Sequence, residues 1–385
     1  MSPSGLNLHN ADRLQWAIRS HRASLVAKAQ KKQAIVRVLS VTSVRNEGPY
    51  LLEWIAHHIG AGVTDFIVVS NDCDDGTHEI LQALDRAGIV THIPQVPLPN
   101  KSIQWQALRT AWRHPLRKTA DWILVSDVDE FLNIHTGNHT ITDLIAKVPN
   151  DTDAIALPWR LFGHNNVTMI QDAPVTEQFT RAIPPDTQFP IAASLFKTLF
   201  RAKGPFNQLG VHRPRQKDPT KAALPNFVDG SGNAMSGFLA RTPHRLSLFD
   251  LGVARDLVEL NHYAVRSAAG FVNKCDRGLP NRAHKPVDLA YWVERNFNNV
   301  IDTSIARMRP ATTAALDRLM AIDGLADLHT QSVAWHRARF NHLISQPAYQ
   351  TLMTQILVAG GGAVLPDHLQ RQLVRWYQQA NKPTG

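Results

Sequence analysis

The sequence predicts an α/β protein with a mostly parallel central sheet flanked by helices. Two observations predict it. Short apolar, β-branched segments alternate with amphipathic segments over about residues 35–158, and the connections between them are short. Such alternation is typical of parallel sheets covered by helices on both faces. At 385 residues, with 44% hydrophobic and 19% charged residues, the chain suits one large domain with additions or two domains.

The first half supplies the strands in order. The expected strands are residues 35–44, 66–70, 89–93, 122–126 and 154–158, and the expected helices are residues 49–60, 77–87, 102–118 and 142–148. Pro49 suits the first turn of the first helix. Gly88 suits the end of the second helix, where a left-handed cap is common.

The second half has weaker periodicity. Proline and polar residues are frequent between residues 160 and 260, which indicates a substrate-facing region with an insertion near 217–240. Helices are expected again at 267–276, 289–296, 312–321, 333–344 and 350–379, the last interrupted at Gly360–Gly362. We therefore expect a helical N-terminal extension at 1–33, a main domain at 34–300 and a helical C-terminal region at 301–385.

Composition argues against several classes of protein. The two cysteines, Cys73 and Cys275, are too few for a disulfide framework or a cysteine metal site. We expect no transmembrane helix, because no apolar run reaches about 18 residues, and no signal peptide at residues 1–10, so the default location is the cytoplasm. The net charge is +9, but only residues 28–32 form a basic cluster and no nucleic-acid-binding motif is present. Anionic nucleotides or an anionic membrane face suit this charge better than nucleic acid.

Asp127 and Asp129 are the best candidates for chemistry. They follow an apolar strand directly, and Val128 and Phe131 interleave with the acids as in a half-buried element. If the triplet is extended, both carboxylates point to one side. The ends of parallel strands are common ligand sites, and Mg²⁺ and Mn²⁺ prefer oxygen ligands. A chance pair of acids in a solvated turn is the alternative interpretation.

Further segments accompany this triplet in a fixed order. They are residues 41–47, 53–54, 68–72, 75–77, 127–131, 157–163, 197–201, 210–212, 261–267 and 274–278. As an ordered set they resemble the family 2-type glycosyltransferases with a GT-A (Rossmann-like) fold, and most closely a family 2-like group related to family 92. The resemblance spans about residues 36–300. It implies a nucleotide-binding half at 34–150 and an acceptor and metal half at 151–300.

The resemblance also implies an activity. The expected reaction is an inverting hexosyl transfer in polysaccharide biosynthesis, from a nucleotide-diphosphate sugar, with a UDP-sugar as first choice, to a glycan or lipid-linked acceptor. Mn²⁺ or Mg²⁺ would assist. Apart from the resemblance, the positive N-terminal extension and the C-terminal helices suit docking on a partner protein or peripherally on the inner face of the membrane. The same aspartates also suit a metal-dependent nucleotidyltransferase or phosphohydrolase, and the fold alone suits a non-catalytic sugar-nucleotide-binding protein.

The resemblance assigns roles to individual residues. The expected donor-binding residues are Ser43, Arg45, Asn46, Glu47, Asn71, Asp72, Asp127, Arg266 and Lys274. The expected metal ligands are Asp127, Asp129, His212 and His262, although Asp127 is alternatively a ribose contact. The expected catalytic residues are Asp129, Arg277 and Glu177, the last chosen as general base over Asp172 and Glu130. The expected acceptor-binding residues are Trp159 and Phe162, for which core packing is the alternative.

Lys274 and Arg277 are also linked by spacing. They are three residues apart on an expected helix and therefore share a face. Cations there would stabilise a departing diphosphate, and a solvated basic face is the alternative. Asp75, by contrast, precedes Gly76 and Thr77 and is expected to shape a turn and cap a helix.

Overall fold

A computed structural model describes residues 36–99, 101–218, 223–235, 237–278 and 287–380. The described residues from Arg37 onward belong to one compact unit. The expected helical extension at residues 1–33 and the basic cluster at 28–32 lie outside the described residues. The boundary at residue 300 stays a prediction.

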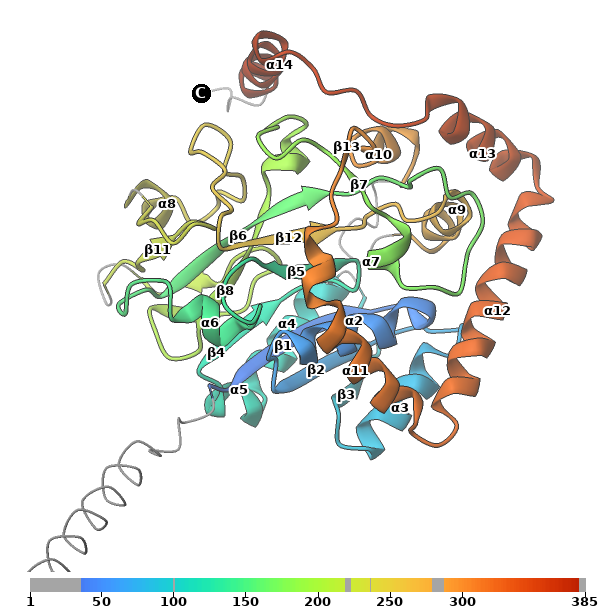
Figure 1. The fold of residues 1–385 in the computed structure, drawn as a ribbon, viewed down its shortest axis with the longest axis horizontal. Coiled ribbons are helices and arrows are strands. Elements are labelled where there is room, and N and C mark those ends of the chain that lie inside the picture. Colours follow the sequence, from blue (N-terminus) through green and yellow to red (C-terminus); the bar gives the residue numbers. More distant parts are fainter. Residues whose placement is uncertain (1–35, 100, 219–222, 236, 279–286, 381–385) are drawn as a thin grey trace, which may run out of the picture. The chain divides into compact units, whose positions relative to one another are not determined.

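A nine-stranded sheet organises this unit (Figure 1). Its order is β3-β2-β1-β4-β8-β6-β12-β5, and β11 pairs with β6. The strands are β1 (Val38–Val44), β2 (Asp65–Ser70), β3 (Thr91–Pro94), β4 (Trp122–Val125), β5 (Glu130–Ile134), β6 (Ala154–Leu161), β8 (Phe196–Arg201), β11 (Phe227–Val228) and β12 (Val258–His262). Most pairs are parallel, whereas β8 and β5 run antiparallel to their neighbours. This confirms the predicted α/β fold with a mostly parallel central sheet.

Helices flank the sheet. They are α2 (Gly48–Gly60), α3 (Thr77–Arg86), α4 (Ile103–Arg113), α5 (Pro115–Thr119), α6 (Ile141–Ile145), α7 (Val175–Gln178), α8 (Gly237–Arg241), α9 (Ala268–Arg277), α10 (Leu289–Val293), α11 (Arg309–Met320), α12 (Leu325–Ile344), α13 (Pro347–Ala359) and α14 (Asp367–Ala380). Two short additional sheets pair β10 (Arg215–Gln216) with β9 (Phe206–Gln208) and β13 (Val300–Ile301) with β7 (Arg181–Ala182). Within the described part of the chain, no helix has the length and hydropathy needed to cross a bilayer.

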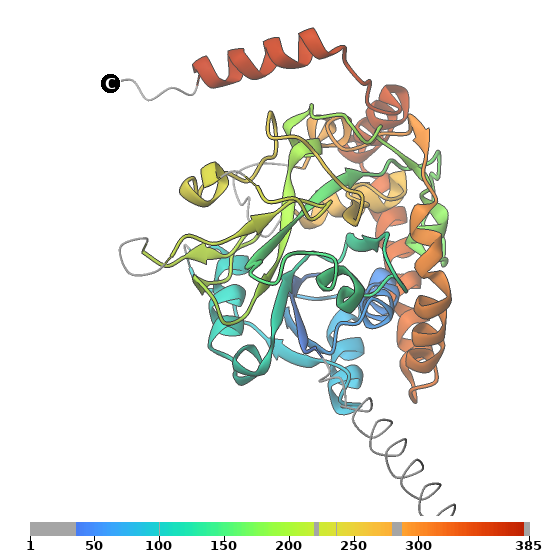
Figure 2. The ribbon, with the colours of Figure 1, turned by 60° about the vertical axis from the view of Figure 1, so that its left-hand side comes forward.

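Alternating side chains of the strands bury both faces of the sheet. Leu39 and Val41 of β1 share a core cluster with Ala107 and Leu108 of α4. On the opposite face, the Trp54 ring of α2 meets Phe66 of β2. The C-terminal helices α11 and α12 pack on α2, and they lie beside it in both views (Figure 1 and Figure 2). The last quarter of the chain therefore covers the helix that follows the first strand.

Two expectations about elements were wrong. The helix expected at 102–118 is split into α4 and α5, because Pro115 lacks an N–H and His114 before it is extended. Strands β5, β8 and β12 were not expected. In β12 the polar residues Glu259 and Asn261 are buried, so its hydropathy pattern does not predict a core strand.

Two buried histidines of α2 predict a loss of stability in mild acid. Burial lowers the pKa of His57 to about 4, and burial together with His57 lowers that of His58 to about 3. In the unfolded chain the imidazole pKa is about 6.5. Below that pH the unfolded chain therefore binds protons that the folded chain does not. The stabilisation is complete above the unfolded pKa and falls as the pH drops toward the folded values. We expect a contribution of up to about 2.7 kcal/mol per pH unit to the slope of unfolding free energy.

Urea denaturation between about pH 7 and pH 5 measures this slope. The matched variant is His58→Phe, which keeps a ring against Trp54 and removes one titrating group. Its slope is expected to be shallower by up to about 1.4 kcal/mol per pH unit. A variant slope equal to that of the wild type contradicts the assignment.

Candidate active site

The two aspartates lie in a turn between β4 and β5. Strand β4 ends at Val125, and the Glu130 N–H donates to Asp127 O (3.0 Å) to close the turn. This corrects the expectation that an extended triplet points both carboxylates to one side. The Asp127 carboxylate accepts hydrogen bonds from Gln104 Nε2 and Lys197 Nζ (each 3.0 Å). The Asp129 carboxylate instead accepts from Lys274 Nζ (2.8 Å).

Lys197 is a fully buried cation beneath the turn. Its Nζ lies 3.0 Å from Asp127 Oδ2 and 3.1 Å from Glu130 Oε2, and its side chain is 0% exposed. Burial alone would lower its pKa, but the two carboxylates more than offset this and raise it. Glu130 also accepts from the Asp127 N–H (2.8 Å). The pair thus fixes the position of Asp127. From the sequence, Glu130 was considered as a general base, and Lys197 was assigned no role.

Asp129 is held as an anion. Burial would raise its pKa, but Lys274 and His262 hold it well below its usual range. Burial lowers the pKa of His262, whereas Asp129 acts in the opposite direction. The separation of His262 Nε2 and Asp129 Oδ1 is 3.6 Å, too long for a hydrogen bond. Two ligands that share one divalent ion, each about 2.1 Å from it, lie at a comparable distance.

The four expected metal ligands do not form one cluster. Among the described residues, no three His, Cys, Asp or Glu side chains converge as metal ligands. Asp129 and His262 approach each other to 3.6 Å, and Lys274 Nζ lies 2.8 Å from the same carboxylate. Asp127 points toward Lys197 and Gln104. His212 contacts the Trp159 ring, whose centroid lies 5.2 Å from that of His212 and 4.1 Å from that of His262.

A cavity of about 240 Å³ lies beside Asp129 and Lys274. Six of the residues expected at the donor or catalytic site line it together: Arg45, Asn46, Glu47, Arg266, Lys274 and Arg277. They come from the end of β1, the loop after β12 and helix α9. Helix α9 begins at Ser267, whose hydroxyl accepts from Gly270 N–H (3.1 Å), and its apolar face is buried. Lys274 and Arg277 therefore share one face, as their spacing predicts.

Glu47 joins two of the cations. Its Oε2 accepts from Arg266 Nη1 (2.8 Å) and its Oε1 from Arg277 Nη1 (2.6 Å). Burial would raise the pKa of Glu47, but Arg277 and Arg266 lower it. This small network keeps two guanidinium groups at the wall of the cavity without leaving a buried charge unpaired.

Arg266 also connects the cavity to the aspartate turn. Its Nη2 donates to Val128 O (3.2 Å), and its guanidinium carbon lies 3.6 Å from the centre of the Tyr50 ring. Its backbone has φ 53°, in the left-handed region that is unfavourable for a residue with a Cβ. Such outliers concentrate at functional sites, which supports a role for Arg266 beyond packing.

The remaining expected donor residues surround the ends of β1 and β2. Arg45 Nε donates to Asp72 O (3.3 Å), and Asn71 Nδ2 donates to Asp72 Oδ2 (3.0 Å). Asn46 and Asp72 have φ of 50° and 45°, which Asn and Asp tolerate better than other residues. Ser43 is half-buried in β1. These contacts bring the two loops together at the carboxyl ends of two parallel strands.

The C-terminal region contributes residues that sequence reasoning missed. Trp335, His336 and Arg339 of α12 line the same cavity, as does Tyr50 of α2. His336 Nε2 lies 2.8 Å from Asp75 Oδ2, which also accepts from Gly48 N–H. The sequence carries no signal for this placement, because it depends on long-range packing of α12. Asp75 also accepts from Thr77 N–H (2.9 Å) and so shapes the turn before α3, as expected, but the N-cap of that helix is Gly76 and not Asp75.

Three expected residues lie away from this cavity. Phe162 is 1% exposed and packs against the Tyr263 ring, so core packing is its role in place of an acceptor contact. Trp159 is 6% exposed and faces the two histidines. Glu177 of α7 pairs with Arg309 (2.8 Å), and no described contact links it to the aspartate turn.

Sequence comparison places the chain near one enzyme family. The family model "Glycosyltransferase family 92" matches residues 40–229, a little under half of the chain, including Asp127 and Asp129 but not residues 262–277. A family 92 protein of Oryza sativa subsp. japonica is 28% identical over 144 residues, which is 36% of this chain and 24% of the relative. A family 92 protein of Arabidopsis thaliana is 24% identical over 182 residues, which is 42% of this chain and 29% of the relative. The chain thus spans only about a quarter of the length of these curated relatives.

Solved structures of glycosyltransferases give weaker similarity. TarS of S. aureus (residues 1–349) covers 90% of this chain and 93% of its own, with 10% identity and a TM-score of 0.31. The mannosyltransferase PcManGT from Pyrobaculum calidifontis, in complex with GDP-Man and Mn²⁺, is 12% identical with a TM-score of 0.27. The match covers 91% of this chain and 94% of PcManGT. These TM-scores are too low to carry an argument.

Proposed function

We propose that this chain is a glycosyltransferase that moves a hexose from a nucleotide-diphosphate sugar, with a UDP-sugar as first choice, to a glycan or lipid-linked acceptor. The family 92 match over residues 40–229 supports the reaction class. The donor class rests on the cavity beside Asp129. We further propose that the chain is related to the family 2-like enzymes of GT-A type, that it inverts the anomeric centre, and that it serves polysaccharide biosynthesis.

The observation that carries the proposal is the convergence of Arg266, Lys274 and Arg277 on one cavity wall. These three cations form ion pairs with two carboxylates, Glu47 and Asp129. The wall therefore keeps an excess of positive charge in a partly buried setting, where electrostatic interactions are strong. A leaving diphosphate gains negative charge as the sugar carbon becomes cationic, and prearranged cations stabilise that charge.

Lys274 links the proposed donor cavity to the aspartate turn. Its Nζ donates to Asp129 Oδ2 and to Ala264 O (2.7 Å), so the ammonium is held in place before any ligand arrives. Arg277 is anchored similarly, by donation to Arg45 O (2.7 Å) and Asn46 O (3.0 Å). Preorganised donors of this kind need no reorganisation during the reaction.

The nucleoside would bind at the ends of β1 and β2. The loops that begin with Arg45 and Asn71 lie at the carboxyl ends of parallel neighbours, where ligands of α/β sheets usually bind. Arg45 and Trp335 supply flat surfaces at the cavity for a base. A divalent ion, Mn²⁺ or Mg²⁺, held by Asp129 and His262 would neutralise charge on the diphosphate. Inversion needs a carboxylate base on the acceptor side, for which Glu177 stays a prediction from the sequence.

Binding of nucleoside diphosphates tests the donor assignment. We expect one of UDP, GDP, CDP or ADP, with Mn²⁺, to raise the thermal midpoint, since a ligand at a hundredfold excess over its Kd stabilises by about 2.7 kcal/mol. Arg277→Met is expected to reduce this shift, whereas Arg318→Met, an exposed arginine on α11, is expected to leave it unchanged. A wild-type protein that none of these nucleotides stabilises contradicts the proposal.

Turnover separates the possible activities. A glycosyltransferase releases nucleoside diphosphate from the matching nucleotide sugar and transfers the sugar when an acceptor is present. A phosphohydrolase or nucleotidyltransferase instead cleaves within the nucleotide, and a binding protein gives no product.

A further inference from the structure

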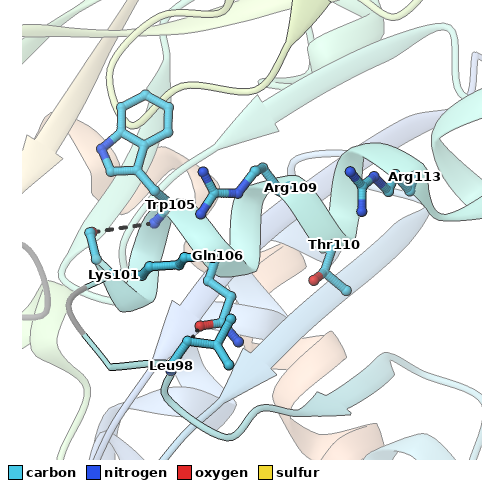
Figure 3. A pocket seen from close by; sticks show the side chains of 8 residues that line it. Leu98, Lys101, Trp105, Gln106, Arg109, Thr110 and Arg113 are labelled. Carbon is cyan, nitrogen blue, oxygen red and sulfur yellow. Dashed lines mark hydrogen bonds between the residues drawn. The ribbon is translucent and has the colours of Figure 1, made fainter.

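A second cavity follows the outer side of α4. It has a volume of about 650 Å³ and opens to solvent (Figure 3). Trp105, Arg109 and Arg113 recur at intervals of four residues, so they lie on one side of the helix, one turn apart, and Lys101 lines the cavity from the loop just before the helix. We call this cavity the α4 groove. No role in the predicted site accounts for it.

The α4 groove carries uncompensated positive charge. Lys101, Arg109 and Arg113 are exposed, and Arg215 from β10 lies 4.8 Å over the Trp105 ring. No described acidic side chain forms an ion pair with any of these four cations. The cavity beside Asp129 differs, because Glu47 and Asp129 already neutralise most of its charge. The α4 groove thus favours an anionic ligand.

The floor of the groove is fixed before a ligand arrives. The Gln106 side chain accepts from Leu98 N–H (3.2 Å) and donates to Val96 O (3.0 Å). These bonds hold the loop before α4 against the helix, and Figure 3 shows Gln106 reaching Leu98. A preformed site avoids the entropy cost of ordering a loop on binding.

The groove lies on the opposite side of α4 from the aspartate turn. Gln104, on the buried face of α4, is 3% exposed and donates to Asp127 Oδ1 (3.0 Å). Helix α4 therefore separates the groove from Asp127.

We propose that the α4 groove binds an acidic saccharide, a part of the acceptor remote from the reacting end, with phosphate or carboxylate groups on Lys101, Arg109 and Arg113. This inference rests on the proposed function and names the acceptor class. A saccharide is favoured over a membrane surface because the site is concave, and the polar side chain of Thr110 lies between the two arginines. The two arginines stand one turn apart, which suits charges repeated along a chain.

Titration calorimetry with defined oligosaccharides tests this. The probes are an oligogalacturonate, a phosphorylated mannooligosaccharide, neutral maltohexaose and vesicles of phosphatidylglycerol. We expect at least one acidic oligosaccharide to bind, with an affinity that falls as salt rises, and maltohexaose not to bind. The carboxylate and phosphate probes identify which group the arginines prefer.

The variant Arg109→Glu/Arg113→Glu is expected to weaken the acidic oligosaccharide at least tenfold. The matched control, Arg86→Glu/Arg318→Glu, makes the same charge change at exposed positions of α3 and α11 and is expected to leave binding unchanged. Both variants change exposed side chains, and an unchanged thermal midpoint verifies folding. Equal binding of maltohexaose, equal loss in the control, or binding of the vesicles alone overturns the proposal.

Donor assays keep this test separate from the proposed function. Binding of the nucleoside diphosphate and slow release of it from the nucleotide sugar without acceptor are expected to be the same in the groove variant and the wild type. If donor binding fails in the wild type while acidic saccharides still bind the groove, the proposed function is wrong and the groove assignment stands as a binding site.

Discussion

Replacement of Asp129 by asparagine is expected to remove nucleoside diphosphate release almost completely. The Asp129 side chain positions Lys274. Asp129 and His262 are also the two residues that we propose as ligands of the divalent ion. Loss of several kcal/mol of transition-state stabilisation corresponds to a fall in kcat of about 10³-fold or more. The measurement is release of nucleoside diphosphate from the matching nucleotide sugar with Mn²⁺. The charge-matched control, Asp317→Asn on the exposed side of α11, is expected to keep wild-type turnover.

A second variant separates a loss of activity from a loss of stability. In Asp129→Asn, Lys274 is left as a largely buried cation without its carboxylate, which costs stability. The double variant Asp129→Asn/Lys274→Met removes both charges. It is expected to recover the thermal midpoint but not the activity. Activity close to that of the wild type in either folded variant contradicts the role given to Asp129.

Replacement of Lys197 by methionine is expected to give the largest loss of stability. The variant leaves Glu130, whose side chain is 0% exposed, without its buried counter-ion. Removing one partner of a buried ion pair typically costs about 3–5 kcal/mol. Urea denaturation measures the loss. The double variant Lys197→Met/Glu130→Gln, which also removes the buried carboxylate, is expected to recover most of it.

The effect of this variant also depends on pH. Burial already raises the pKa of Glu130 well above its usual value, and Asp127 and Asp129 raise it further, while Lys197 opposes them. Without Lys197, the folded state binds a proton that the unfolded state has released. A group with a raised folded pKa stabilises below its unfolded value and loses that stabilisation as the pH rises. The destabilisation by Lys197→Met is therefore expected to be smaller at about pH 5 than at pH 8, and the opposite trend contradicts a charged partner at this site.

Local patterns were sufficient to predict β1, β2, β3, β4 and β6 in the first half of the fold, but not β5. Strands β1, β2 and β4 are apolar runs buried by helices on both faces, and the helices between them have apolar residues at helical spacing. Strands β5, β8 and β12 were missed for a physical reason. They place polar residues such as Lys197, Glu259 and Asn261 in the interior, where partners across the sheet satisfy them. A hydropathy pattern cannot show such partners, because they come from distant segments.

The candidate site also contains residues that the sequence predicted and residues that it did not. Arg266, Lys274 and Arg277 were predicted from a motif and from spacing on a helix, and they do line one cavity. The turn at Asp127 was not predicted. Gln104 and Lys197, which are distant in sequence, donate to the Asp127 carboxylate and hold it apart from that of Asp129. The α12 residues were not predictable either, because nothing near Trp335 or Arg339 in the sequence resembles a ligand-binding motif.

The placement of α12 has a consequence for engineering. Trp335, His336 and Arg339 lie within two turns of a single helix, and that helix comes from the last quarter of the chain. The other residues that line the cavity include those of the loop after β1 and of α9. Grafting a foreign sequence onto that one face, while retaining the His336 to Asp75 tether, would redesign the pocket's selectivity and leave the reactive centre intact. Truncated forms that omit the helix would lose one side of the pocket altogether.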